Sequence, residues 1–174
     1  MSHESLSPTD VFRGTILSVD PGEHNGICVL DLYSSTRSDS PWPKLNGYFV
    51  KTKAFLTAEG DNELIDFAFD AIRTYKNRPL YITVEHFVFT RTSMMGGSRG
   101  AIEMTGAIKA IRRLHAPEVK LFTDQKPADA KLIKNSVLEQ LGIKVKGDKS
   151  TDHAHMAAKH ALVLALRIKK GEIL

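Results

Sequence analysis

The sequence has 174 residues, 42% of them hydrophobic, a length that suits a single domain with one substantial core. Its net charge of +4 is uneven, because residues 109–170 hold 14 Lys and Arg against 6 Asp and Glu, and the rest of the chain holds 10 against 14. No apolar run is long enough to cross a bilayer, and residues 1–10 lack the apolar stretch of a signal peptide. We therefore expect a soluble cytoplasmic protein whose basic second half suits a polyphosphate partner.

The first part of the chain is typical of β-structure. A polar arm over residues 1–13 precedes a β-branched and aliphatic strand at 15–19, which ends at an Asp-Pro-Gly turn. Residues 26–32 and 45–53 form the next two expected strands, so the chain opens with an antiparallel meander. The only cysteine, Cys28, lies among aliphatic residues and is expected to be a buried thiol.

The pattern then changes to a period of 3.6 residues. Apolar side chains predict a helix over residues 62–75, followed by a short apolar strand at 80–84, a glycine-rich loop at 90–100 and a second helix at 101–114. The remaining expected elements are a strand at 119–122, a helix at 127–141, a basic loop at 143–149 and a last helix at 152–168. This order predicts a single α/β domain over residues 14–174, with a mixed five-stranded sheet and helices on both faces.

Three acidic residues fall at the ends of these elements. Asp20 ends the first strand, Glu85 follows the fourth, and Asp152 opens the last helix. If the first and fourth strands are neighbours, the three carboxylates converge at one edge of the sheet, where they could hold hard divalent cations on a phosphodiester. Each also has an ordinary explanation, as a turn residue, a solvated strand end or a favourable charge at a helix N-terminus.

Histidines in the last helix could complete such a site. His155 lies three residues after Asp152, on the same helical face, and can bind a metal or move a proton. His153 points about 100° away from Asp152, so we expect it not to serve the same ion. His160 is expected to be a packed residue or one that supports the site indirectly.

Three segments resemble the RuvC-type Holliday junction resolvases. They are residues 16–22 (ILSVDPG) followed by Asn25-Gly26, residues 81–85 (YITVE) and residues 152–158 (DHAHMAA). The resemblance covers residues 15–168, and Gly106 and residues 127–131 are similar to those of small phage-encoded members. It implies a ribonuclease H-like fold, a homodimer in a bacterial or phage-infected cell, Mg²⁺ or Mn²⁺ in a two-metal site, and paired nicks in four-way DNA junctions.

The resemblance also implies roles for individual residues. Asp20, Glu85 and Asp152 would be metal ligands, and His155 stands where most members have their last aspartate. An alternative register of this helix pairs His153 and Met156 with the family's two acidic positions. The residues implied in DNA contact are Phe87, Phe89, Arg91, Arg99, Lys131 and Lys134.

Other functions are compatible with parts of the pattern. Asp-Pro-Gly followed by Asn-Gly also resembles the phosphate loop of actin-like ATPases and sugar kinases, but those proteins need two such lobes. A catalytically weakened junction-binding protein and a nuclease of the same fold acting on RNA or RNA–DNA hybrids both stay open.

Overall fold

The computed structural model describes residues 10–22, 24–34, 44–45, 48–58, 60–86, 98–123, 125–143 and 152–169. Within these ranges six strands form one mixed sheet in the order β3-β4-β2-β1-β5-β6. The strands are β1 (Val11–Asp20), β2 (Asn25–Ser34), β3 (Lys44–Leu45), β4 (Tyr48–Ala58), β5 (Leu80–Val84) and β6 (Lys120–Phe122). The sheet therefore contains one more strand than expected, the two-residue β3, which pairs with the start of β4.

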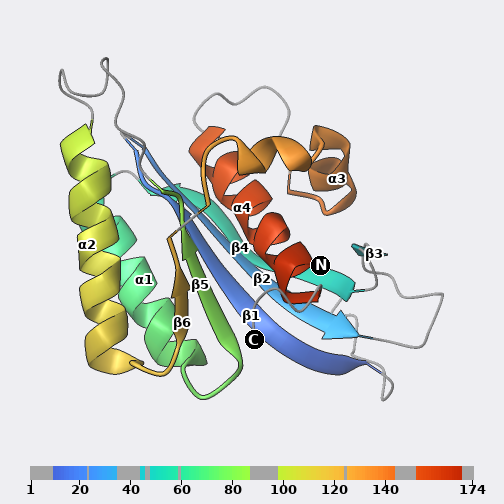
Figure 1. Ribbon diagram of the computed structural model, residues 1–174, viewed down its shortest axis with the longest axis horizontal. Helices are drawn as coiled ribbons and strands as arrows, with labels where there is room; N and C mark the ends of the chain where they lie inside the picture. Colours follow the sequence, from blue (N-terminus) through green and yellow to red (C-terminus); the bar gives the residue numbers. More distant parts are fainter. Residues whose placement is uncertain are drawn as a thin grey trace.

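Helices cover both faces of the sheet (Figure 1). They are α1 (Asp61–Tyr75), α2 (Ser98–His115), the short 3₁₀ helix η2 (Asp129–Leu132), α3 (Asn135–Gln140) and α4 (Asp152–Lys169). Helices α1 and α2 lie on one side, whereas α3 and α4 lie on the other (Figure 1). The predicted α/β class, with a mixed sheet between two helical layers, is confirmed. None of the helices in the described ranges is long and apolar enough to cross a membrane.

Alternation of side chains along β1 separates two cores. Leu17 and Val19 pack with the buried residues of α1 and α2, whereas Ile16 packs with those of α3 and α4. Cys28 belongs to the second core, as expected, and burial raises the pKa of its thiol above the usual value. Because Asp20 is an even number of residues from Ile16, its side chain also faces the α4 layer.

The expected single helix over residues 127–141 is wrong. The chain forms η2, then becomes extended at Ile133 and Lys134, and starts again as α3. Ile133 is 4% exposed and packs in the core beneath α4, together with Leu138 of α3. In a continuous helix these two side chains would point in different directions and would not both enter this core. Tertiary packing therefore overrides the local helical pattern.

Candidate active site at the carboxyl ends of β1 and β5

Asp20 and Glu85 lie on neighbouring strands. Strands β1 and β5 run parallel with Val19 opposite Val84, and the backbone N–H of Glu85 donates to the Val19 carbonyl at 3.1 Å. The carboxyl ends of two adjacent parallel strands therefore deliver both acids to one edge of the sheet. This is the convergence that the sequence predicts for the first and fourth of its expected strands.

The environment of Asp20 opposes its negative charge. The residue is 5% exposed, and burial together with the nearby Glu85 raises the pKa of its carboxyl, although a hydrogen bond from His153 partly offsets the rise. The carboxylates of Asp20 and Glu85 repel each other, and burial weakens the screening of this repulsion by water. The site is therefore suited to a group that supplies positive charge.

The turn after β1 is fixed by Asn25. Its side-chain oxygen accepts a hydrogen bond from the Gly22 N–H at 3.3 Å, and its amide nitrogen donates to Asp61 at the start of α1, at 3.4 Å. Asn25 itself is fully buried, and both contacts are partly buried. The residues that follow the Asp-Pro-Gly motif therefore hold the end of β1 against α1.

Gly26 lets α4 approach the sheet. A Cβ atom added at Gly26 would lie 2.0 Å from the His153 carbonyl oxygen and 2.5 Å from the Ala154 nitrogen. These contacts are with backbone atoms, which cannot move aside without displacing the whole first turn of the helix. The glycine of the Asn-Gly motif thus sets the distance between α4 and the carboxylates.

We expect Gly26→Ala to displace the start of α4 and to lower the free energy of unfolding by about 1–3 kcal/mol, a typical cost of overpacking. Thermal unfolding monitored by circular dichroism measures the effect. Gly100→Ala is the matched control, because a Cβ at Gly100 in α2 meets nothing within 4 Å. Equal melting temperatures for the Gly26 variant and the wild type would contradict the close approach.

His153, in the first turn of α4, contacts Asp20. Its Nδ1 atom lies 3.0 Å from Asp20 Oδ2, and the side chain is 37% exposed, so one face of the ring remains accessible. The imidazole therefore stands at the boundary between the buried carboxylate and solvent. We expected its ring to point away from the site, and the structure corrects this.

His155 occupies a different place from the one expected. Its ring stacks on Phe55 of β4, with centroids 5.5 Å apart and planes at 22°. Two residues of α-helix correspond to about 200° of rotation, so His153 and His155 face different strands. The close approach at Gly26 fixes the rotation of α4 that turns His153, and not His155, toward Asp20. Asp152 is the first residue of the same helix.

His160 contacts the other carboxylate. Its Nε2 atom lies 2.5 Å from Glu85 Oε2, and its Nδ1 atom lies 2.9 Å from the side-chain oxygen of Gln125. His160 lies seven residues, or about two turns, after His153, so both fall on one helical face. This seven-residue spacing is present in the sequence, but it was not part of the expected site. For Gln125 the sequence offers no comparable signal.

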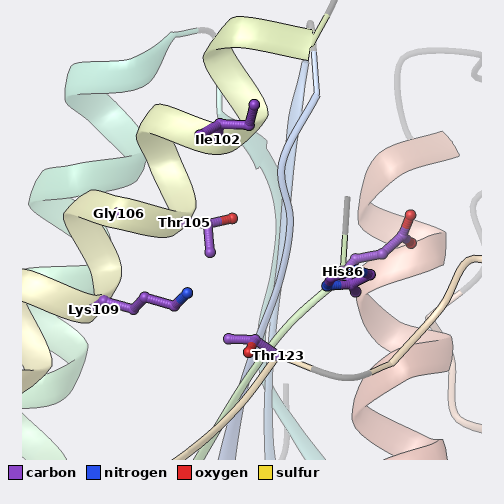
Figure 2. A pocket seen from close by; sticks show the side chains of 7 residues that line it. His86, Ile102, Thr105, Gly106, Lys109 and Thr123 are labelled. Atoms are coloured by element: carbon purple, nitrogen blue, oxygen red, sulfur yellow. The ribbon is translucent and has the colours of Figure 1, made fainter. Parts of the chain in front are cut away.

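A cavity opens beside Glu85. It has a volume of about 380 Å³ and is lined by Glu85, His86, Ile102, Thr105, Gly106, Lys109 and Thr123. Figure 2 shows Thr105 and Lys109 projecting from α2 toward the end of the sheet, where His86 and Thr123 lie. Hydroxyl and ammonium donors therefore line the space next to a carboxylate. In the sequence, Lys109 stands out only as part of the basic half of the chain.

The residues expected to contact DNA are only partly described. Phe87, Phe89 and Arg91 lie outside the described residues, and Arg99 belongs to the first turn of α2. Lys131 on η2 and Lys134 before α3 are exposed. Both lysines are thus available to a partner in solution.

Comparison with solved structures agrees with this architecture. A Thermus thermophilus RuvC structure superposes with a TM-score of 0.63 at 13% sequence identity, covering 90% of this chain and 96% of that one. T. thermophilus RuvC in complex with Holliday junction substrate superposes with a TM-score of 0.65 at 14% identity and the same coverage. The chain has the RuvC fold. Its sequence matches no family model and no curated protein.

The three sequence segments that carry the resemblance lie close together in this fold. In this chain they supply the end of β1, the end of β5 and the first turns of α4, which the structure brings together. The predicted ribonuclease H-like class is therefore confirmed at the level of the fold.

Proposed function

We propose that the chain is a divalent-metal-dependent endonuclease that cuts branched DNA, resolving four-way junctions by paired nicks as a homodimer. The observation that carries this proposal is the pair of carboxylates, Asp20 and Glu85, at the ends of adjacent parallel strands, with Glu85 also lining a cavity that contains Lys109. The solved RuvC complex with Holliday junction substrate, which shares the fold, supports a junction as the substrate to test first.

The residues present fit a divalent cation. Burial and, to a smaller extent, the nearby Glu85 raise the pKa of Asp20, and a bound cation would offset both effects. Mg²⁺ is commonly held by only one or two carboxylates, with water and substrate phosphate as its other ligands. Within the described residues no group of three or more His, Cys, Asp or Glu side chains is arranged as a metal site. Asp20 and Glu85 would therefore hold the ion, and we propose Asp152 as a third ligand.

When bound, such an ion would polarise the scissile phosphate and stabilise the leaving oxyanion. The chain's own residues would place the substrate. Lys109 would contact a backbone phosphate as a point charge, and Thr105 and Thr123 would donate hydrogen bonds from either side of the cavity. His153, at the accessible edge of the site, would orient Asp20.

The decisive experiment compares labelled four-way, Y-shaped and linear duplex DNA and an RNA–DNA hybrid, each with Mg²⁺, Mn²⁺ or chelator. Symmetric nicks in the four-way substrate alone, lost on chelation, are the expected result. Cleavage of an RNA–DNA hybrid in preference to the junction would show that the proposed substrate is wrong. Cutting of every duplex alike would remove the specificity for branched DNA.

Binding to DNA should depend steeply on salt. We expect Lys109→Ala to reduce the slope of log affinity against log salt by about 0.9, because one phosphate contact is lost. Lys131→Ala and Lys134→Ala should act similarly if both lysines contact the backbone. Fluorescence anisotropy with a labelled junction measures the slopes. Lys76→Ala is the matched control, since Lys76 follows α1 near the opposite end of β5. A wild-type slope in the Lys109 variant would contradict the proposed contact between Lys109 and a backbone phosphate.

A second candidate is a catalytically weakened junction-binding protein. It is favoured by the absence of a three-donor metal group within the described ranges and by Met156, which the alternative register pairs with a family aspartate. The cleavage experiment separates the two, because this candidate binds the four-way junction without cutting it under any metal condition.

A further inference from the structure

The side chain of Gln125 bonds to two different parts of His160. Gln125 is fully buried between β6 and η2, and its amide nitrogen donates to the His160 backbone carbonyl at 3.2 Å. Its amide oxygen lies 2.9 Å from Nδ1 of the same histidine. The backbone of this residue is also engaged, since the Gln125 carbonyl accepts from the His86 N–H at 2.7 Å. Gln125 thus ties α4 to the segment that follows Glu85.

These contacts determine the orientation of the amide. A backbone carbonyl can only accept, so the atom of Gln125 that faces it must be the nitrogen. The other amide atom is then the oxygen, which can only accept, and His160 Nδ1 must therefore carry a proton.

The orientation of the His160 ring also determines its contact with Glu85. With the Nδ1 proton committed to Gln125, the ring presents only Nε2 to Glu85, at 2.5 Å from Oε2. The hydrogen bond between these two atoms needs a second proton, either on Nε2 or on the carboxyl group. His160 is 0% exposed, so water does not compete for the ring. The short contact holds one carboxylate oxygen of Glu85 in a fixed place at the end of β5.

We propose that Gln125 is a positioning residue for the candidate site: it holds His160 by its backbone carbonyl and its Nδ1–H, so that the hydrogen bond between Nε2 and Oε2 orients the Glu85 carboxyl group. This inference rests on the proposed function, because the orientation of Glu85 matters for binding a cation. An oriented carboxylate binds a cation with less reorganisation. Groups that hydrogen-bond to metal ligands from behind commonly change metal affinity by ~10–100-fold when removed. Gln125 supports the site in this sense without touching substrate.

The first test reads the tautomer directly and needs neither metal nor DNA. In metal-free protein labelled with ¹⁵N, two-bond ¹H–¹⁵N correlation spectra of the imidazoles should show His160 with a protonated Nδ1. Gln125→Glu loses the donor to the His160 carbonyl but keeps an oxygen acceptor for Nδ1, so it should preserve this signature, whereas Gln125→Leu should lose it. A wild-type ring with an unprotonated Nδ1, or an unchanged signature in Gln125→Leu, would overturn the proposal.

The second test measures Mn²⁺ binding by electron paramagnetic resonance of the free ion. We expect Gln125→Leu to bind Mn²⁺ ~10–100-fold more weakly than the wild type. A Leu164 variant, Val or Ala, matched in melting temperature to Gln125→Leu, is the control for general destabilisation of α4. Wild-type Mn²⁺ affinity in Gln125→Leu, or an equal loss in the Leu164 control, would overturn the positioning role. If the tautomer and Mn²⁺ results are as expected but junction DNA is not cut, the positioning role of Gln125 stands and only the proposed cleavage of junctions is ruled out.

Discussion

Asp20→Asn and Glu85→Gln are each expected to abolish metal-dependent cleavage of branched DNA while leaving junction binding intact. Both substitutions keep the size and shape of the side chain and remove only the negative charge that would hold the cation. A bound cation contributes several kcal/mol of transition-state stabilisation, so the single-turnover rate should fall by ~10³-fold or more. Cleavage of a labelled four-way junction and its anisotropy in Ca²⁺ or chelator measure the two properties separately.

The matched control is Asp66→Asn, which removes one exposed carboxylate from α1, away from the ends of β1 and β5. It should retain the wild-type rate. Turnover near the wild-type level in either Asp20→Asn or Glu85→Gln would rule out a cation held between these residues.

Asp20→Asn should also change the pH dependence of stability in the metal-free protein. Because the pKa of Asp20 is raised in the fold, the folded state binds this proton more tightly than the unfolded state, and ionisation of the group costs stability as the pH rises. The variant cannot ionise there and should melt at a higher temperature than the wild type near pH 7. The difference should vanish as the pH falls toward the ordinary value of 3.8. Thermal melts between pH 4 and about pH 7 test the sign of the difference in melting temperature between the variant and the wild type. A lower melting temperature for the variant throughout would contradict it.

The second large effect is expected at the start of α4. His153→Ala removes the hydrogen bond that lowers the pKa of Asp20 and should reduce cleavage by ~10–100-fold, as for other groups that orient metal ligands. His155→Ala removes a ring stacked on Phe55, so it should cost stability while largely preserving the rate of cleavage. Single-turnover rates and melting temperatures of the two variants distinguish these outcomes.

His155→Asp extends the comparison. If His155 were a metal ligand, this change would shift activity from Mn²⁺ toward Mg²⁺, since Mg²⁺ prefers an all-oxygen shell. The structure leads us to expect no such shift, together with a loss of stability from placing a carboxylate against Phe55. Strong Mg²⁺ activity in His155→Asp would contradict the placement of residue 155 away from the metal.

The sequence by itself determined the α/β class and the positions of Asp20 and Glu85. Both follow from local signals: aliphatic runs that stop at a turn or an acid, and strands that alternate with helices of period 3.6. Because adjacent parallel strands end at the same edge, finding the two strands was enough to predict that the acids meet. The Asn-Gly that follows the first strand was part of the resemblance, although its steric purpose was not visible there.

Only the tertiary structure decided which histidines reach the acids. A helix pattern fixes which residues share a face, but it does not fix the rotation of that helix against the sheet. In this chain the rotation depends on the contact between Gly26 and the backbone of α4, made across residues more than a hundred positions apart. Gln125 is a stronger case, because its role comes from hydrogen bonds across 35 residues to His160, and no local pattern encodes a partner at that distance.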